Sequence, residues 1–183
     1  MTGAGSVTGD ERLRLFLALR LPEDVLDEIE RWQYAQLQSV RVVPREHLHL
    51  TLAFLGQRPS GELGAIVGAL RDASTGAREI RLTPVRYRET RSVGMLVLDD
   101  EEGGATTLAG DLQQRLERLG VYRHESRPWL PHVTVARWRE RPRLRPELPT
   151  VGTFVPSDAA AYLSRLHPGG ARYEVLESVA LGG

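Results

Sequence analysis

Two short segments share the pattern His-x-Thr-x, with an aliphatic residue at each x: His49-Leu50-Thr51-Leu52 and His132-Val133-Thr134-Val135. Two imidazoles can serve one reaction as general base and general acid near neutral pH, because their unperturbed pKa is about 6.5. Threonine hydroxyls can donate hydrogen bonds to the non-bridging oxygens of a phosphate. Two histidines and two threonines in one site would therefore suit in-line displacement at a phosphodiester without a metal ion.

The spacing inside each motif has a direct structural meaning if the segment is a strand. Residues two apart on a strand share a face, so each His and Thr would point one way and the aliphatic pair the other. The expected strands are His47–Leu55 and Pro131–Trp138, where polar and apolar residues alternate. A single His-x-Thr also occurs as a buried histidine or an exposed polar pair, so spacing alone leaves a shared site and a purely structural role both open.

The remaining pattern predicts an α+β protein with antiparallel sheets and a weak internal duplication, one motif strand in each half. Pro22 and two acidic residues open a helix that fades near Ser39, with Val25, Ile29, Trp32 and Gln36 on one face. The other expected helices are Ser60–Ala73, with Ser60 as N-cap, and Ala105–Leu119. The other expected strands are Arg14–Leu21, Val40–Val43, Ile80–Tyr87, Val93–Leu98, Ala159–Leu166 and Arg172–Leu181, the last two forming a hairpin.

Length and composition exclude several classes of protein. The chain has 183 residues and a formal net charge of zero. It has no Cys, which excludes a disulfide framework and a thiolate metal site. All its basic side chains other than His are Arg, so lysine chemistry such as a Schiff base is excluded. We expect residues 1–10 to be a disordered leader and residues 11–183 to form one bilobal domain. No apolar run is long enough to span a membrane, and we expect a cytoplasmic monomer.

The two motifs in their contexts, His49–Gly56 and Pro131–Arg137, resemble the RNA 2′,3′-cyclic phosphodiesterase family of 2H phosphoesterases, whose members are often called 2′-5′ RNA ligases. The resemblance runs over nearly the full chain, from Arg14–Pro22 to Tyr162–Leu176. It implies a bilobal α+β fold, with two pseudo-symmetric antiparallel sheets, flanking helices and a central cleft. It also implies hydrolysis of an RNA 2′,3′-cyclic phosphate to a 2′-phosphate, with 2′-5′ joining as a reverse-type reaction.

The resemblance assigns roles to individual residues. His132 would be the base that activates water, and His49 the acid that protonates the departing 3′ oxygen. Thr51 and Thr134 would hold the phosphate, and Arg137 would contact it. No metal or other cofactor is implied, and the partners are RNA ends carrying a cyclic phosphate or a small cyclic nucleotide.

Three residues near the motifs raise questions that alternation alone does not answer. Arg137 is an odd number of positions from His132, so the strand must twist, bulge or end for Arg137 to reach the cleft. Phe54 holds the equivalent position in the first motif, where it would either stack on a base or pack in the core. His47 replaces the Asn usual in the family, and is either at the cleft edge or a partly exposed strand residue.

Alternatives to the leading hypothesis differ in substrate or in class. Alternating arginines from Arg137 to Arg145 would form a rail for an RNA backbone if extended, or otherwise a solvated loop. A phosphodiesterase acting on a small cyclic nucleotide and a non-catalytic RNA- or nucleotide-binding module both stay open. A metal hydrolase built on His47 and His49 is disfavoured, because neither motif contains a carboxylate.

Overall fold

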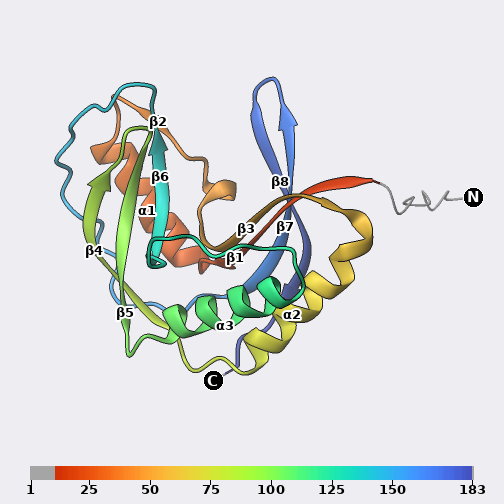
Figure 1. Cartoon of the computed structure of the whole chain (residues 1–183). Helices are drawn as coiled ribbons and strands as arrows, with labels where there is room; N and C mark the ends of the chain where they lie inside the picture. Colours follow the sequence, from red (N-terminus) through yellow and green to blue (C-terminus); the bar gives the residue numbers. More distant parts are fainter. Residues whose placement is uncertain (1–10, 183) are drawn as a thin grey trace, which may run out of the picture.

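The computed structural model describes residues 11–182, which form two four-stranded sheets and three α-helices (Figure 1). The leader expected for residues 1–10 lies outside this range. In chain order the elements are β1 (Arg12–Arg20), α1 (Glu23–Gln36), β2 (Arg41–Val42), the 3-10 turn η1 (Arg45–His47), β3 (His49–Pro59), the 3-10 turn η2 (Ser60–Glu62), α2 (Leu63–Thr75), β4 (Arg81–Glu89), β5 (Val93–Glu101), α3 (Gly104–Arg118), β6 (His132–Arg137), β7 (Asp158–His167) and β8 (Gly170–Val179).

The two sheets confirm the predicted α+β fold with antiparallel sheets. The first sheet has the strand order β3-β1-β7-β8 and the second β2-β6-β5-β4, and neighbouring strands in both run antiparallel. Neither sheet is a contiguous half of the chain, because the first combines N-terminal strands with the closing hairpin β7–β8. Each sheet nevertheless contains one motif strand, β3 in the first and β6 in the second.

The helices cover the faces of the sheets that lie away from the motif side chains. Helix α2 packs against β7 and β8, and α3 against β3 and β5, while α1 lies behind the second sheet (Figure 1). Strand β1 shows how the sequence supports this arrangement, since Leu15, Leu17 and Leu19 enter the main core. Its alternate residues Phe16 and Ala18 form a small second cluster with Tyr162 on the opposite face, toward the other sheet.

Three local expectations were wrong. His47 ends the 3-10 turn η1, where its N–H donates to the Pro44 carbonyl (2.9 Å), so a local turn after a proline replaces the first strand residues. Helix α2 begins at Leu63, after η2, and Ser60 is not its N-cap. On α1 the buried glutamine is Gln33 rather than Gln36, because the Gln33 amide finds hydrogen-bond partners inside the protein.

Within residues 11–182, no helix is both long and apolar enough to cross a bilayer.

Candidate active site

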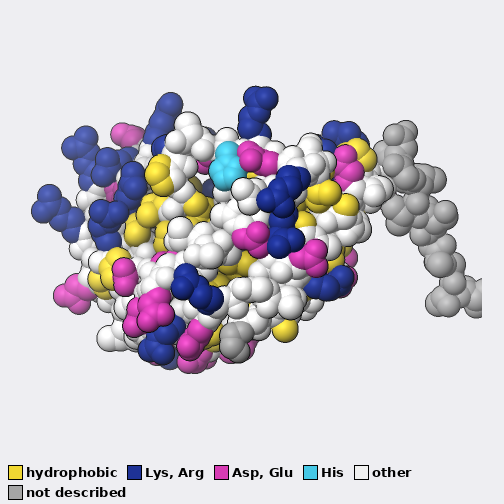
Figure 2. All heavy atoms as spheres, turned by 60° about the horizontal axis from the view of Figure 1, so that its bottom comes forward, with side chains coloured by type: hydrophobic (Ala, Val, Ile, Leu, Met, Phe, Trp, Pro, Cys, Tyr) yellow, Lys and Arg dark blue, Asp and Glu magenta, His cyan; other side chains and the backbone are white. Residues whose placement is uncertain are grey.

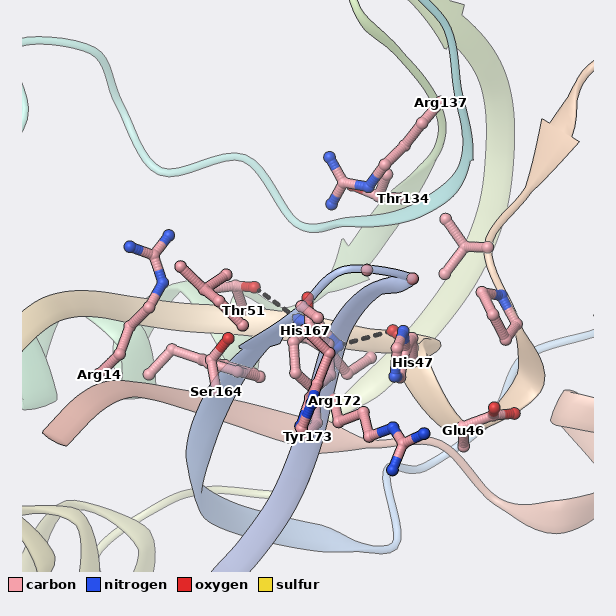
Figure 3. Close-up of a pocket in the computed structure, with 18 of the residues that line it drawn as sticks. Arg14, Glu46, His47, Thr51, Thr134, Arg137, Ser164, His167, Arg172 and Tyr173 are labelled. Atoms are coloured by element: carbon pink, nitrogen blue, oxygen red, sulfur yellow. Dashed lines mark hydrogen bonds between the residues drawn. The ribbon is translucent and has the colours of Figure 1, made fainter.

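The two motif strands face one another across a pocket of about 800 Å³ between the sheets. Its lining includes all four motif side chains that sequence reasoning selected, namely His49, Thr51, His132 and Thr134. Figure 3 shows Thr51 on β3 and Thr134 on β6 on opposite sides of the pocket. Their positions follow from alternation, because Leu50 and Val133, which stand between the histidine and the threonine of each motif, are fully buried in the core.

A β-bulge at the same place in each motif strand decides which side chains follow the motif into the pocket. Leu17 and Ala18 of β1 pair with Ala53 and Thr51, which leaves Leu52 as an extra residue in β3. In the same way Gly94 and Met95 of β5 pair with Ala136 and Thr134, which leaves Val135 extra in β6. A bulge shifts the alternation by one residue.

The consequence is that Phe54 and Arg137 both line the pocket, although each is an odd number of positions from its histidine. The burial pattern is the same in the two strands from His49 to Phe54 and from His132 to Arg137. Phe54 is 49% exposed. The guanidinium carbon of Arg14 lies over the Phe54 ring, 4.9 Å from the ring centroid. The alternative in which Phe54 packs in the core is therefore wrong. Of the twist, bulge or strand end expected before Arg137, the structure has a bulge.

Both catalytic candidates are held by the same backbone contact. The Nδ1 atom of His49 lies 2.8 Å from the His47 carbonyl oxygen, and that of His132 lies 2.7 Å from the Leu130 carbonyl oxygen. A carbonyl oxygen can only accept, so Nδ1 must carry the hydrogen in both neutral rings. The lone pair of each neutral ring is then on Nε2, which makes Nε2 the proton-accepting atom at both positions.

The two histidines differ in their surroundings. His49 lies among aromatic rings, with centroids 4.9 Å from Phe16, 5.9 Å from Tyr162 and 5.8 Å from Tyr173. Burial lowers the pKa of His49 to about 4, and the nearby charges of His47, Arg137 and His132 act in the same direction. His49 is therefore a neutral imidazole at neutral pH when the pocket holds no anion, and its Nε2 accepts a hydrogen bond from the Thr51 hydroxyl (2.9 Å).

We expect His49 to gain a proton when an anion enters the pocket. A phosphate beside the ring favours the imidazolium, and protonation of Nε2 would free the Thr51 hydroxyl hydrogen for a phosphate oxygen. In an NMR titration the ring proton of His49, assigned by its loss in His49→Asn, should titrate near pH 4 in the free protein. Saturating inorganic phosphate should move that midpoint upward, and an unchanged midpoint would contradict this account.

Four arginines that line the pocket form no ion pair with any other described residue: Arg14, Arg41, Arg137 and Arg172. Glu46 is the one carboxylate among the described lining residues. Elsewhere arginines commonly have acidic partners, as in Arg20–Asp158 and Arg45–Glu23. The pocket thus carries uncompensated positive charge in a chain whose formal net charge is zero.

The face of the molecule drawn in Figure 2 carries both kinds of charge. Figure 2 shows basic side chains gathered at the end of the molecule that carries the second sheet, with acidic and basic side chains interspersed elsewhere.

Of the two alternatives for Arg137 to Arg145, a rail or a loop, the rail does not form as an extended row. Only Arg137 of that series lines the pocket. Arg141 instead pairs with Glu89 (3.0 Å), whose carboxylate also accepts from the backbone N–H groups of Arg143 (3.0 Å) and Leu144 (2.7 Å). These contacts fold the segment after β6 around a carboxylate that is almost fully buried, so the loop interpretation fits the structure better.

Sequence reasoning missed the contribution of the closing hairpin. Ser164, His167, Arg172 and Tyr173 from β7 and β8 line the pocket, and Figure 3 shows this hairpin beside Thr51. His47 also lines it, with its ring 4.2 Å from that of Tyr173. The alternation of residues along the two hairpin strands could have shown that these residues share one face of the sheet. Their proximity to β3 was not, because β1 separates β3 from β7 in the sheet.

One indole links the two motif regions directly. The Nε1–H of Trp129, three residues before His132, donates to the backbone carbonyl of Thr51 (3.1 Å). This contact ties the segment leading into β6 to β3. Among residues 11–182 no group of three or more His, Cys, Asp or Glu side chains is arranged to hold a metal ion.

Comparison with known proteins agrees with this geometry. A family model described as the 2′-5′ RNA ligase superfamily matches residues 21–167. A Thermus thermophilus protein named RNA 2′,3′-cyclic phosphodiesterase is 33% identical over 93% of this chain and 91% of its own length. A Methanocaldococcus jannaschii protein of the same name is 25% identical over 90% of this chain and 99% of its own length.

A solved structure is similar over the same extent. The crystal structure of E. coli LigT complexed with 3′-AMP superposes with a TM-score of 0.81 at 26% identity, covering 94% of this chain and all of that one.

Proposed function

Because the chain belongs to the 2′-5′ RNA ligase superfamily, we propose that it hydrolyses the 2′,3′-cyclic phosphate at an RNA end to a 2′-phosphate. The relatives named RNA 2′,3′-cyclic phosphodiesterase, at 25% and 33% identity over most of the chain, support this activity. The observation that carries the proposal is the pocket itself, in which two His-x-Thr strands from different sheets present matching side chains to one space.

The proposed chemistry is an in-line displacement by water. His132 Nε2 takes a proton from water as the water oxygen bonds to phosphorus. The bond between phosphorus and the 3′ oxygen breaks, and His49 gives its Nε2 proton to that oxygen. The product then carries a 2′-phosphate and a free 3′-hydroxyl, and a proton transferred from His132 to His49 through solvent restores the starting state.

The remaining side chains act on the phosphate. The hydroxyls of Thr51 and Thr134 would donate to its non-bridging oxygens, and the Arg137 guanidinium would balance the charge that builds up there. Proton gain by His49 would be coupled to phosphate binding through the hydrogen bond between His49 and Thr51. Such coupling explains how a ring with a pKa of about 4 in the free protein could act as the acid in the complex.

The test is hydrolysis of an RNA oligonucleotide ending in 2′,3′-cyclic phosphate, carried out in EDTA. We expect a product whose mass rises by one water and whose phosphate is on the 2′ oxygen. A 3′-phosphate product, or a requirement for metal, would overturn the proposed mechanism. Adding an RNA with a 5′-hydroxyl to the same reaction tests 2′-5′ joining, which we propose as the reverse-type reaction.

A second candidate is hydrolysis of a small cyclic nucleotide. The four unpaired arginines of the pocket favour the longer substrate, because one terminal phosphate cannot neutralise all of them. Equal kcat/KM for the oligonucleotide and for the matching 2′,3′-cyclic mononucleotide would favour the small substrate. Binding of either without turnover would favour a non-catalytic binding module.

A further inference from the structure

The bulges that turn Phe54 and Arg137 into the pocket have equivalent partners in the core. Two buried glutamine side chains, one on α1 and one on α3, each donate a hydrogen bond to the carbonyl of the bulged residue. Gln33 Nε2 lies 2.9 Å from the Val135 oxygen, and Gln113 Nε2 lies 2.8 Å from the Leu52 oxygen. The glutamines are only 3% and 6% exposed, respectively.

The chemistry of these contacts is specific to an amide. A bulged residue is out of register with one neighbouring strand, so the ladder uses only part of its hydrogen-bonding capacity. The Val135 carbonyl accepts from the backbone N–H of Val43 (2.9 Å), and the Gln33 amide is its second donor. The Gln33 amide supplies two hydrogens, and its Nε2 also donates to the Val43 carbonyl (3.0 Å) where β2 joins the second sheet. An apolar side chain of the same length would leave buried carbonyl oxygens without this donor.

Gln113 borders a neighbouring hollow that also includes Thr51 and Phe54. Neither glutamine lines the motif pocket itself. Each touches the backbone two residues before a side chain that does line it, Phe54 in β3 and Arg137 in β6. The contact pattern is therefore the same in both halves of the site, although the helices come from different parts of the chain. Stabilisation of the core alone would not require both glutamines to donate to the carbonyl of a bulged residue.

We propose that Gln33 and Gln113 are positioning residues, which hold the two bulges so that Arg137 and Phe54 face the phosphate pocket. The proposal rests on the proposed function for its kinetic consequences, and on geometry alone for its structural ones. Gln33 acts through Arg137 and Gln113 acts through Phe54. The two effects are therefore separable.

The kinetic test is a pair of double-mutant cycles, Gln33→Met with Arg137→Ala and Gln113→Met with Phe54→Ala. A misplacement of about 1 Å can cost on the order of 10²-fold, so we expect each Met variant to lower kcat/KM by roughly 10- to 10²-fold. That loss should largely disappear when the dependent side chain is already Ala. The crossed pairs, such as Gln33→Met with Phe54→Ala, should be additive.

Exposed neighbouring glutamines provide matched controls. Gln36→Met and Gln114→Met change the same side chain on the same helices without touching a bulge, and should leave kcat/KM unchanged. Additivity in the two matched cycles, or equal losses in the control variants, would overturn the proposal. If Gln33→Met does not fold, the Gln113 cycle decides by itself.

Crystal structures of the two Met variants separate this proposal from the proposed function. We expect the Val135 bulge to shift and Arg137 to leave the pocket in Gln33→Met, with β3 unchanged, and the reverse in Gln113→Met. Bulges and side chains that keep their places would overturn the proposal whatever the activity. A wild-type protein without turnover would overturn the proposed function, while the structural comparison would still test the glutamines.

Discussion

Replacement of either motif histidine should lower kcat/KM for cyclic-phosphate hydrolysis by roughly 10²–10⁴-fold, the range typical of a lost general acid or base. In His132→Ala no imidazole takes the proton from water, and in His49→Ala none supplies a proton to the 3′ oxygen. The measurement is initial rate against substrate concentration with the oligonucleotide described above. Because both side chains are only partly exposed, folding of each variant should be checked by circular dichroism.

His124→Ala is the matched control for this prediction. His124 does not line the motif pocket, although it borders the neighbouring hollow that includes Thr51 and His132. Its side chain is 48% exposed, contacts Glu117 and takes part in no proposed step, so its loss should leave the rate nearly unchanged. A His49→Ala or His132→Ala variant with the wild-type rate would remove that residue from the mechanism. Equal, severe losses in both variants are compatible with it, because a concerted transfer needs both groups.

Arg137→Ala should have the second-largest effect. A hydrogen bond to a charged group is worth about 1.5–3 kcal/mol, which corresponds to roughly 10- to 150-fold in kcat/KM. Arg137 forms no ion pair with a described residue, so the loss would come from the substrate and not from a broken internal contact. Arg137→Lys keeps the charge without the planar fork and should fall between the wild type and Arg137→Ala.

Arg139→Ala controls for the loss of one positive charge near the pocket. Arg139 is exposed, two residues beyond Arg137, and is not among the pocket-lining residues. Raising the salt concentration should weaken wild-type activity more than that of Arg137→Ala, since the lost contact is electrostatic. If Arg137→Ala and Arg139→Ala lowered kcat/KM by the same small factor, the phosphate would have to be held by the other arginines or by the threonines.

Much of the site could be predicted from the sequence because it depends on local periodicity. The alternation around His49 and His132 placed each histidine and threonine on one face of a strand, and the buried Leu50 and Val133 confirm it. The closing hairpin was predictable from local pattern as well, since Pro168 and the glycines after it mark a turn between two strand segments. Repetition of the motif, together with the resemblance, indicated that two strands share a function.

Other features required contacts between residues distant in the chain. The burial that lowers the pKa of His49 comes from Phe16, Tyr162 and Tyr173, which reach it only because β1, β7 and β8 share its sheet. The split of each sheet between distant strands is equally invisible to local patterns, because strand order depends on long-range pairing.

The sequence by itself determined which residues could do the chemistry and which face of a strand each histidine occupies, because both follow from side-chain type and a period of two. The resemblance placed Arg137 at the phosphate, but only the tertiary structure decided how Arg137 and Phe54 come to face the pocket. Their direction depends on a bulge, and each bulge carbonyl is bonded by a glutamine on a helix far away in the chain. A bulge shifts alternation by one residue, and no periodicity in the strand marks where that shift occurs.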